Sequence, residues 1–209
     1  MTTAAHQTLT LFIRPALAWA GAPYNPRIQS LAAERMMLAI ALQESRCRDR
    51  IQIGGAGQRL AHLARSLWQL ERDGGVAEVC QHPALAWCRA SILALGYRID
   101  RDELHRAIAY DQTLAAIMAR GLLWLDPAPL PLEADSAYAY YIRRWRPGKP
   151  RPETWPENWR IATALVEESD EPSLSDAADR RLPDHHHGDL DLSRYVNLDG
   201  SPSYPGEKS

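Results

Sequence analysis

Residues 36–42 constrain the fold of this chain more than any other stretch, because seven consecutive apolar residues cover every face of a helix. A helix with no polar side is stable only when it is buried all round. Asn25 and Pro26 supply an N-cap and a first-turn proline, so we predict a helix from there to Ser45. We expect this helix to form the centre of the core.

The rest of the chain also favours helices. Alanine is abundant, valine is scarce, and no alternating apolar pattern runs for more than a few positions, so the predicted class is all-α. A small β-excursion is expected at residues 50–58. Asp102 and Asp111 are the predicted N-caps of two helices. The predicted helices, besides the central one, cover residues 8–20 with a kink at Pro15, about 60–70, 82–95, 103–109, 112–125, 135–145 and 154–168.

Charge divides the 209-residue chain into two parts. Residues 166–209 hold eleven acidic and four basic residues, a net charge of −7, so residues 1–165 carry +5. The 45% hydrophobic content is enough for one sizeable core. We therefore predict a folded domain at residues 1–168 and a flexible acidic tail at 169–209. The mild positive charge of the domain suits an anionic polymer but lacks the basic stripe that predicts nucleic-acid binding.

The chain lacks the sequence patterns of a membrane segment, a signal peptide and a metal site. No apolar run is long enough to insert into a membrane, and the first residues lack the features of a signal peptide, so synthesis in the cytoplasm is expected. The three cysteines, odd in number and without metal-ligand spacing, are expected to be free thiols. Residues 185–187 are consecutive histidines, but without fixed partners they predict no metal site. No metal and no cofactor are expected.

Glu44 is the candidate catalytic residue. It ends the apolar helix, where partial burial and the negative end of the helix dipole both raise the pKa of a carboxyl. A carboxylic acid kept protonated near neutral pH is what a glycosidase needs to protonate its leaving oxygen. The alternative interpretation is that Glu44 pairs with Arg48, four residues later, and merely closes the helix.

A family resemblance adds to this interpretation. Glu44 and Ser45, a glycine-bearing loop and the sequence Ser-Leu-Trp-Gln at residues 66–69 resemble the lytic transglycosylase and goose-type lysozyme superfamily, which reads Glu-Ser, a loop and Gly-Leu-Met-Gln. Residues 8–165 also resemble small proteins of tailed phages and prophages, through residues 39–45, 68–71, 74–76, 82–84 and 140–150. The resemblance implies a lysozyme-like fold that cleaves the β-1,4 bond between N-acetylmuramic acid and N-acetylglucosamine in peptidoglycan.

The resemblance also implies roles for individual residues. Glu44 matches the single catalytic acid and base, Ser45 the serine that orders the site, and Gln69 the glutamine that lines the sugar groove. Either Tyr140 or Tyr141 stands near the tyrosine of the superfamily's Ala-Tyr-Asn motif, although this stretch has no Asn.

Three features depart from the superfamily pattern or stay open. Ser66 replaces the usual glycine, and Trp68 replaces the usual methionine. Trp68 adjoins Gln69 and is a candidate for stacking on a sugar, with packing in the core as the commoner role of such an aromatic residue. The loop is longer than usual near residues 56–62, which would narrow the groove.

The reaction type and the class of protein stay open at this point. A lytic transglycosylase needs one carboxylate, whereas a hydrolase needs a second one about 5–9.5 Å away. Glu71 and Asp73 are the candidates for the second carboxylate, with Asp73 favoured as part of a solvated turn. The expected partners are peptidoglycan strands, reached through a holin or in a virion. The alternative is a virion structural or assembly protein on a lysozyme-like scaffold, since fold does not imply function.

Overall fold

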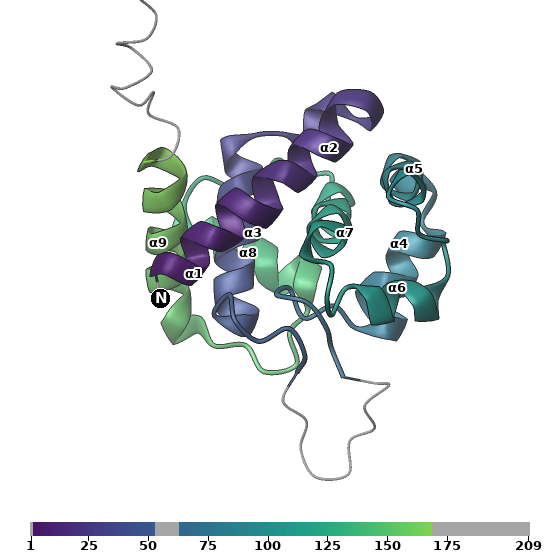
Figure 1. Ribbon diagram of the computed structural model, residues 1–209. Helices are drawn as coiled ribbons and strands as arrows, with labels where there is room; N and C mark the ends of the chain where they lie inside the picture. Colours follow the sequence, from purple (N-terminus) through teal and green to yellow (C-terminus); the bar gives the residue numbers. More distant parts are fainter. Residues whose placement is uncertain (1, 53–62, 169–209) are drawn as a thin grey trace, which may run out of the picture. The chain divides into compact units, whose positions relative to one another are not determined.

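The computed structural model describes residues 2–52 and 63–168 (Figure 1). These residues form helices joined by turns, and their only strand-like pairings are isolated bridges of Arg65 with Ile51 and with Leu70, so the all-α class is confirmed. The predicted acidic tail and the excess loop at residues 56–62 lie outside the described residues. The helices are α1 (Thr2–Gln7), η1 (Thr8–Ile13), α2 (Arg14–Tyr24), η2 (Pro26–Ile28), α3 (Leu31–Ser45), η4 (Arg72–Val76), α4 (Ala77–Gln81), η5 (Pro83–Leu85), α5 (Ala86–Ala94), α6 (Arg101–Ala107), α7 (Gln112–Trp124), α8 (Ala134–Trp145), η6 (Pro152–Thr154) and α9 (Trp155–Glu168).

Helix α3 is the central helix that the sequence predicts. Residues 36–42 are almost wholly buried, and α3 packs against η1, α7 and α9 (Figure 1). The predicted start of this helix is wrong: Asn25 caps the short 3-10 helix η2, and α3 begins after Ser30. The extended backbone of Ser30 interrupts the helical path, and its hydroxyl accepts a hydrogen bond from the Ala33 amide at 3.1 Å.

Three other local predictions need correction. The first predicted helix extends further at both ends, from Thr2 to Tyr24, with a π-helical stretch just before Pro15. Asp100, not Asp102, caps α6, because its carboxylate accepts from the Glu103 amide at 2.8 Å. The predicted helix near 60–70 is absent from residues 63–71, which form turns and the isolated bridges. Asp111 caps α7 as predicted.

Helices α8 and α9 cover one side of the core. Trp155 and Trp159 stack at the start of α9 with ring centroids 6.1 Å apart, and Tyr141 of α8 stacks on Trp155 at 5.0 Å. These rings join α8 to α9, which packs along α3. The three cysteines are free thiols, as predicted. No helix in residues 2–52 or 63–168 is long and apolar enough to cross a membrane.

Candidate active site

A cavity of about 820 Å³ lies at the C-terminal end of α3. Its walls come from α3, the turn at residues 64–71, η4 and α4, α7, α8 and the segment 146–151. Four predicted site residues line this cavity, and three others lie in the core. The lining group is Glu44, Gln69, Glu71 and Tyr141; the core group is Ser45, Trp68 and Tyr140.

Glu44 is half-buried in the last turn of α3 and lines the cavity. Burial raises the pKa of its carboxyl, and the nearby Glu71 charge adds to this increase. A hydrogen bond from Tyr141 and the positive charge of Arg151 act in the opposite direction without cancelling it. Burial was a predicted cause of this shift. The alternative ion pair between Glu44 and Arg48 is not formed.

Tyr141 is the tyrosine that meets the candidate acid. Its hydroxyl donates to Glu44 Oε1 at 2.7 Å. Burial, followed by the Glu44 charge, raises the pKa of Tyr141, so the phenol keeps its proton and remains a donor. Tyr140 points elsewhere: its side chain is buried and its hydroxyl donates to the Leu123 carbonyl at 2.7 Å. The structure thus places Tyr141, and not Tyr140, at the cavity.

Gln43 and Arg151 form a clamp that sequence reasoning missed. The Gln43 amide nitrogen donates to the Arg151 carbonyl at 3.0 Å, and the Arg151 guanidinium donates to the Gln43 carbonyl. The amide oxygen of Gln43 accepts from Thr154 Oγ1 at 3.0 Å and from Asn158 Nδ2 at 2.7 Å. The clamp ties the end of α3 to the segment that carries the basic wall of the cavity. A buried glutamine directly after the apolar stretch 36–42 was the signal for it.

Hydrogen bonds of Ser45 and Trp68 fix the turn at residues 66–69 on its core side. The Ser45 hydroxyl donates to the Leu67 carbonyl at 2.7 Å, while the Trp68 indole donates to the Met37 carbonyl at 2.9 Å. The predicted stacking of Trp68 on a sugar is wrong for this structure: its ring is 0% exposed and its indole nitrogen is already bonded in the core. Ser45 and Trp68 therefore position the turn and do not reach the cavity.

Gln69 and Glu71 form one rim of the cavity. The backbone of Gln69 is left-handed, with φ of 49°. Its side-chain nitrogen Nε2 donates to the carbonyls of Asp49 and Ser66, each at 2.8 Å. These bonds fix Gln69 and leave its amide oxygen as the group available to a ligand. Glu71 follows the turn and is exposed.

Gly75 explains how closely η4 packs beside this rim. A Cβ atom there would come within 2.8 Å of Leu122 Cδ1 in α7 and 3.4 Å of Leu70 Cδ2. A larger residue at position 75 would therefore force the Leu122 side chain or η4 to shift at this wall of the cavity.

Basic side chains form the remaining wall. Arg144 is bound to both carboxylate oxygens of Glu78 at 3.1 Å, and its Nε donates to the Leu122 carbonyl. Arg146 and Lys149 are exposed and make no ion pair with any described residue. The cavity that Glu44 and Glu71 line is therefore also lined by unpaired positive charge.

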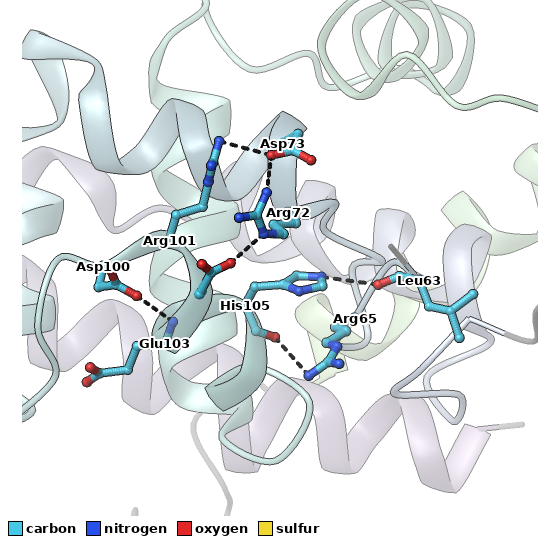
Figure 2. Close-up of polar contacts among 9 residues, drawn as sticks. Leu63, Arg65, Arg72, Asp73, Asp100, Arg101, Glu103 and His105 are labelled. Atoms are coloured by element: carbon cyan, nitrogen blue, oxygen red, sulfur yellow. Dashed lines mark hydrogen bonds and ion pairs between the residues drawn. The ribbon is translucent and has the colours of Figure 1, made fainter. Parts of the chain in front are cut away.

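A second polar cluster links residues 63–73 to α6 (Figure 2). Arg72 bonds to Asp102 and, at 2.6 Å, to Asp73, which also pairs with Arg101 at 2.9 Å. The ring of His105 lies 3.1 Å from the Leu63 carbonyl. The described part of the chain has no group of three His, Cys, Asp or Glu side chains placed to hold a metal ion. Histidines 185–187, which are predicted to form no metal site, lie outside the described residues.

Comparison of the whole chain with protein-family models, with curated proteins and with solved structures gave no match.

Proposed function

We propose that this chain cleaves the β-1,4 bond between N-acetylmuramic acid and N-acetylglucosamine in peptidoglycan, as a lytic transglycosylase with Glu44 as its single acid and base. The observation that carries the proposal is the Glu44 carboxyl, which lines a cavity of about 820 Å³ with a raised pKa and one oxygen bonded to Tyr141. A cavity of this size suits a ligand of a few sugar rings. A carboxyl that stays protonated can give a proton to the glycosidic oxygen.

The hydrogen bond from Tyr141 determines which oxygen of Glu44 carries the transferred proton. Because Tyr141 occupies Oε1, the acidic proton of Glu44 belongs on Oε2, from which it passes to the glycosidic oxygen as the C1–O4 bond breaks. The 6-hydroxyl of the muramyl ring then attacks C1 and gives its proton to the Glu44 carboxylate. The new O6–C1 bond replaces the old C1–O4 bond, and Glu44 ends the cycle protonated, with no water consumed.

Arg151 and the basic wall supply the electrostatics of the proposed reaction. The Arg151 charge favours the Glu44 carboxylate and so stabilises the anion formed when the proton leaves. Arg146 and Lys149 present unpaired cations to the cavity, which suits a polymer bearing the carboxylates of peptide substituents.

Hydrolysis is the second candidate, and one observation favours it. Glu71 lines the same cavity as Glu44, and its charge acts on the Glu44 pKa, so Glu71 is the candidate for the second carboxylate that a hydrolase needs. We further propose that the protein reaches the cell wall through a holin or as part of a virion.

Product analysis tests the proposal. Wild type, Glu44→Gln and the control Glu157→Gln, an exposed carboxylate of α9 paired with Arg160, are incubated with isolated peptidoglycan. Soluble products are analysed by mass spectrometry. We expect fragments ending in 1,6-anhydromuramic acid from wild type and the control, and none from Glu44→Gln. Reducing-end fragments would indicate the hydrolase instead. No release by folded wild type would contradict both and favour the virion structural protein.

A further inference from the structure

Arg120 of α7 is an unusual cation, because it is 4% exposed and lacks an acidic partner. Its Nε donates to the Ile28 carbonyl at 2.9 Å, and its guanidinium lies over the Trp124 ring at 5.5 Å. No described carboxylate forms an ion pair with it, and burial lowers its pKa to about 10, which leaves it charged at neutral pH. A buried charge without a counterion is costly, so proteins seldom keep one without a use for it.

A second cavity, of about 400 Å³, adjoins Arg120 at the C-terminal end of α7. Since Nε is occupied by Ile28, the two terminal nitrogens of Arg120 are the donors left for this cavity. Its one acidic lining residue, Asp126, is bound to Arg143 at 2.8 Å. The other lining residues are apolar: Leu123, Trp124, Pro127, Ala128, Pro129 and Leu130.

We infer that this second cavity binds a small organic monocarboxylate, with the carboxylate on the terminal nitrogens of Arg120 and the apolar body against the proline-rich wall. Two parallel N–H groups match the two oxygens of a carboxylate in one plane. The apolar wall favours an organic body over inorganic phosphate, and the nearby Asp126 carboxylate disfavours a second negative charge. The contact with Trp124 holds the guanidinium in place before the ligand arrives. This site is separate from the Glu44 cavity and does not depend on its proposed activity.

Calorimetric titration of the full chain with matched ligands tests the inference. The probes are benzoate, its neutral isostere benzamide, and inorganic phosphate. The proteins are wild type, Arg120→Met, Arg120→Lys and the control Arg27→Met, which removes an exposed arginine with no side-chain partner among the described residues. We expect benzoate to bind wild type and the control with one-to-one stoichiometry, and at least about tenfold more weakly to both Arg120 variants.

Three results would overturn the inference: equal benzoate affinity in the Arg120 variants, equal affinity of wild type for benzamide or phosphate, or no benzoate binding to folded wild type. Each would assign Arg120 a purely structural role. The Arg120→Met variant removes an unpaired buried charge while keeping a long side chain, so we expect it to fold. Circular dichroism checks this, and Arg120→Lys, which keeps the charge without the planar pair of donors, gives a second measurement of the same effect.

Discussion

Glu44 and Asp102 are both carboxylates near arginines, yet burial raises the pKa of the first and a hydrogen bond from Arg72 lowers that of the second. Asp102 belongs to a partly exposed network with Arg72, Asp73 and Arg101, in which each charge has an opposite charge within bonding distance. Glu44 has one neutral donor, Tyr141, and otherwise faces a cavity. The difference indicates that a carboxyl becomes a candidate proton donor where burial leaves it with few hydrogen-bond and charge partners. A carboxylate in a complete ion-pair network stays ionised.

Glu44→Gln should have the largest effect on activity. We expect peptidoglycan cleavage to fall by at least about a thousandfold, because the amide cannot donate the proton. The same change should leave stability unchanged or raise it at neutral pH. A raised pKa means that the folded state disfavours the ionised carboxyl, so wild type loses stability as the pH rises above the ordinary value near 4.5, and the amide avoids that loss.

Paired activity and thermal unfolding measurements at pH 4 and pH 7 check this prediction. Asp102→Asn is the matched control from the Arg72 network, and it should keep activity. A Glu44→Gln variant that lost both activity and folding would place Glu44 among the structural carboxylates and remove the contrast.

His105 offers the largest expected effect on stability. Burial, followed by the Arg65 charge, lowers its pKa to about 4 from an ordinary 6.5. The unfolded chain therefore binds an extra proton between these values, so stability is full above pH 6.5 and declines as the pH falls towards 4. We expect the loss from this group to approach about 3 kcal/mol.

Chemical denaturation between pH 4 and 7 measures that slope. His105→Gln should flatten it, whereas His6→Gln, at an exposed position of α1, should not. An unchanged slope in His105→Gln would assign the acid sensitivity to other groups.

Tyr141→Phe should have an intermediate effect on activity and on its pH dependence. Loss of its hydrogen bond removes a contact that lowers the Glu44 pKa, so that pKa should rise further and the alkaline limb of the pH–rate profile should move to higher pH. We expect activity at the optimum to fall about tenfold, because the carboxyl is no longer held in one orientation.

Tyr140→Phe is the matched control for this measurement. It removes a buried hydrogen bond to the Leu123 carbonyl and should lower the melting temperature without moving the pH–rate profile. Equal shifts of the profile in the two variants would contradict the role given to Tyr141.

The fold was more predictable from sequence than the site, for a physical reason. The all-apolar stretch 36–42 and the cap at Asp111 act locally, so the central helix and the start of α7 follow from sequence alone. The start of α3 was missed because Asn25 and Pro26 suit a short 3-10 turn equally well. Local rules cannot distinguish such a turn from the first turn of a long helix.

At the cavity, sequence reasoning predicted Glu44 as a candidate but could not choose between Tyr140 and Tyr141. Adjacent residues on a helix point about 100° apart, so only tertiary packing decides which one meets α3. Trp68 was misplaced for a similar reason, since a large ring next to a functional turn can face either way. Arg151 has no local pattern, because its contact with Gln43 joins residues 108 positions apart.

Arg72→Gln should have the smallest effect. The Asp73 and Asp102 carboxylates of its ion pairs are 56% and 51% exposed and therefore screened by solvent, so we expect the melting temperature to change by less than about 3 °C and the change to shrink at high salt. Activity should equal that of wild type, because the Arg72 network supplies no group to the cavity. Calorimetry at low and high salt, together with the peptidoglycan assay, measures both quantities. A shift of the pH–rate profile in Arg72→Gln would mean that the network reaches Glu44 through the 63–72 segment, and the two regions could then no longer be treated as independent.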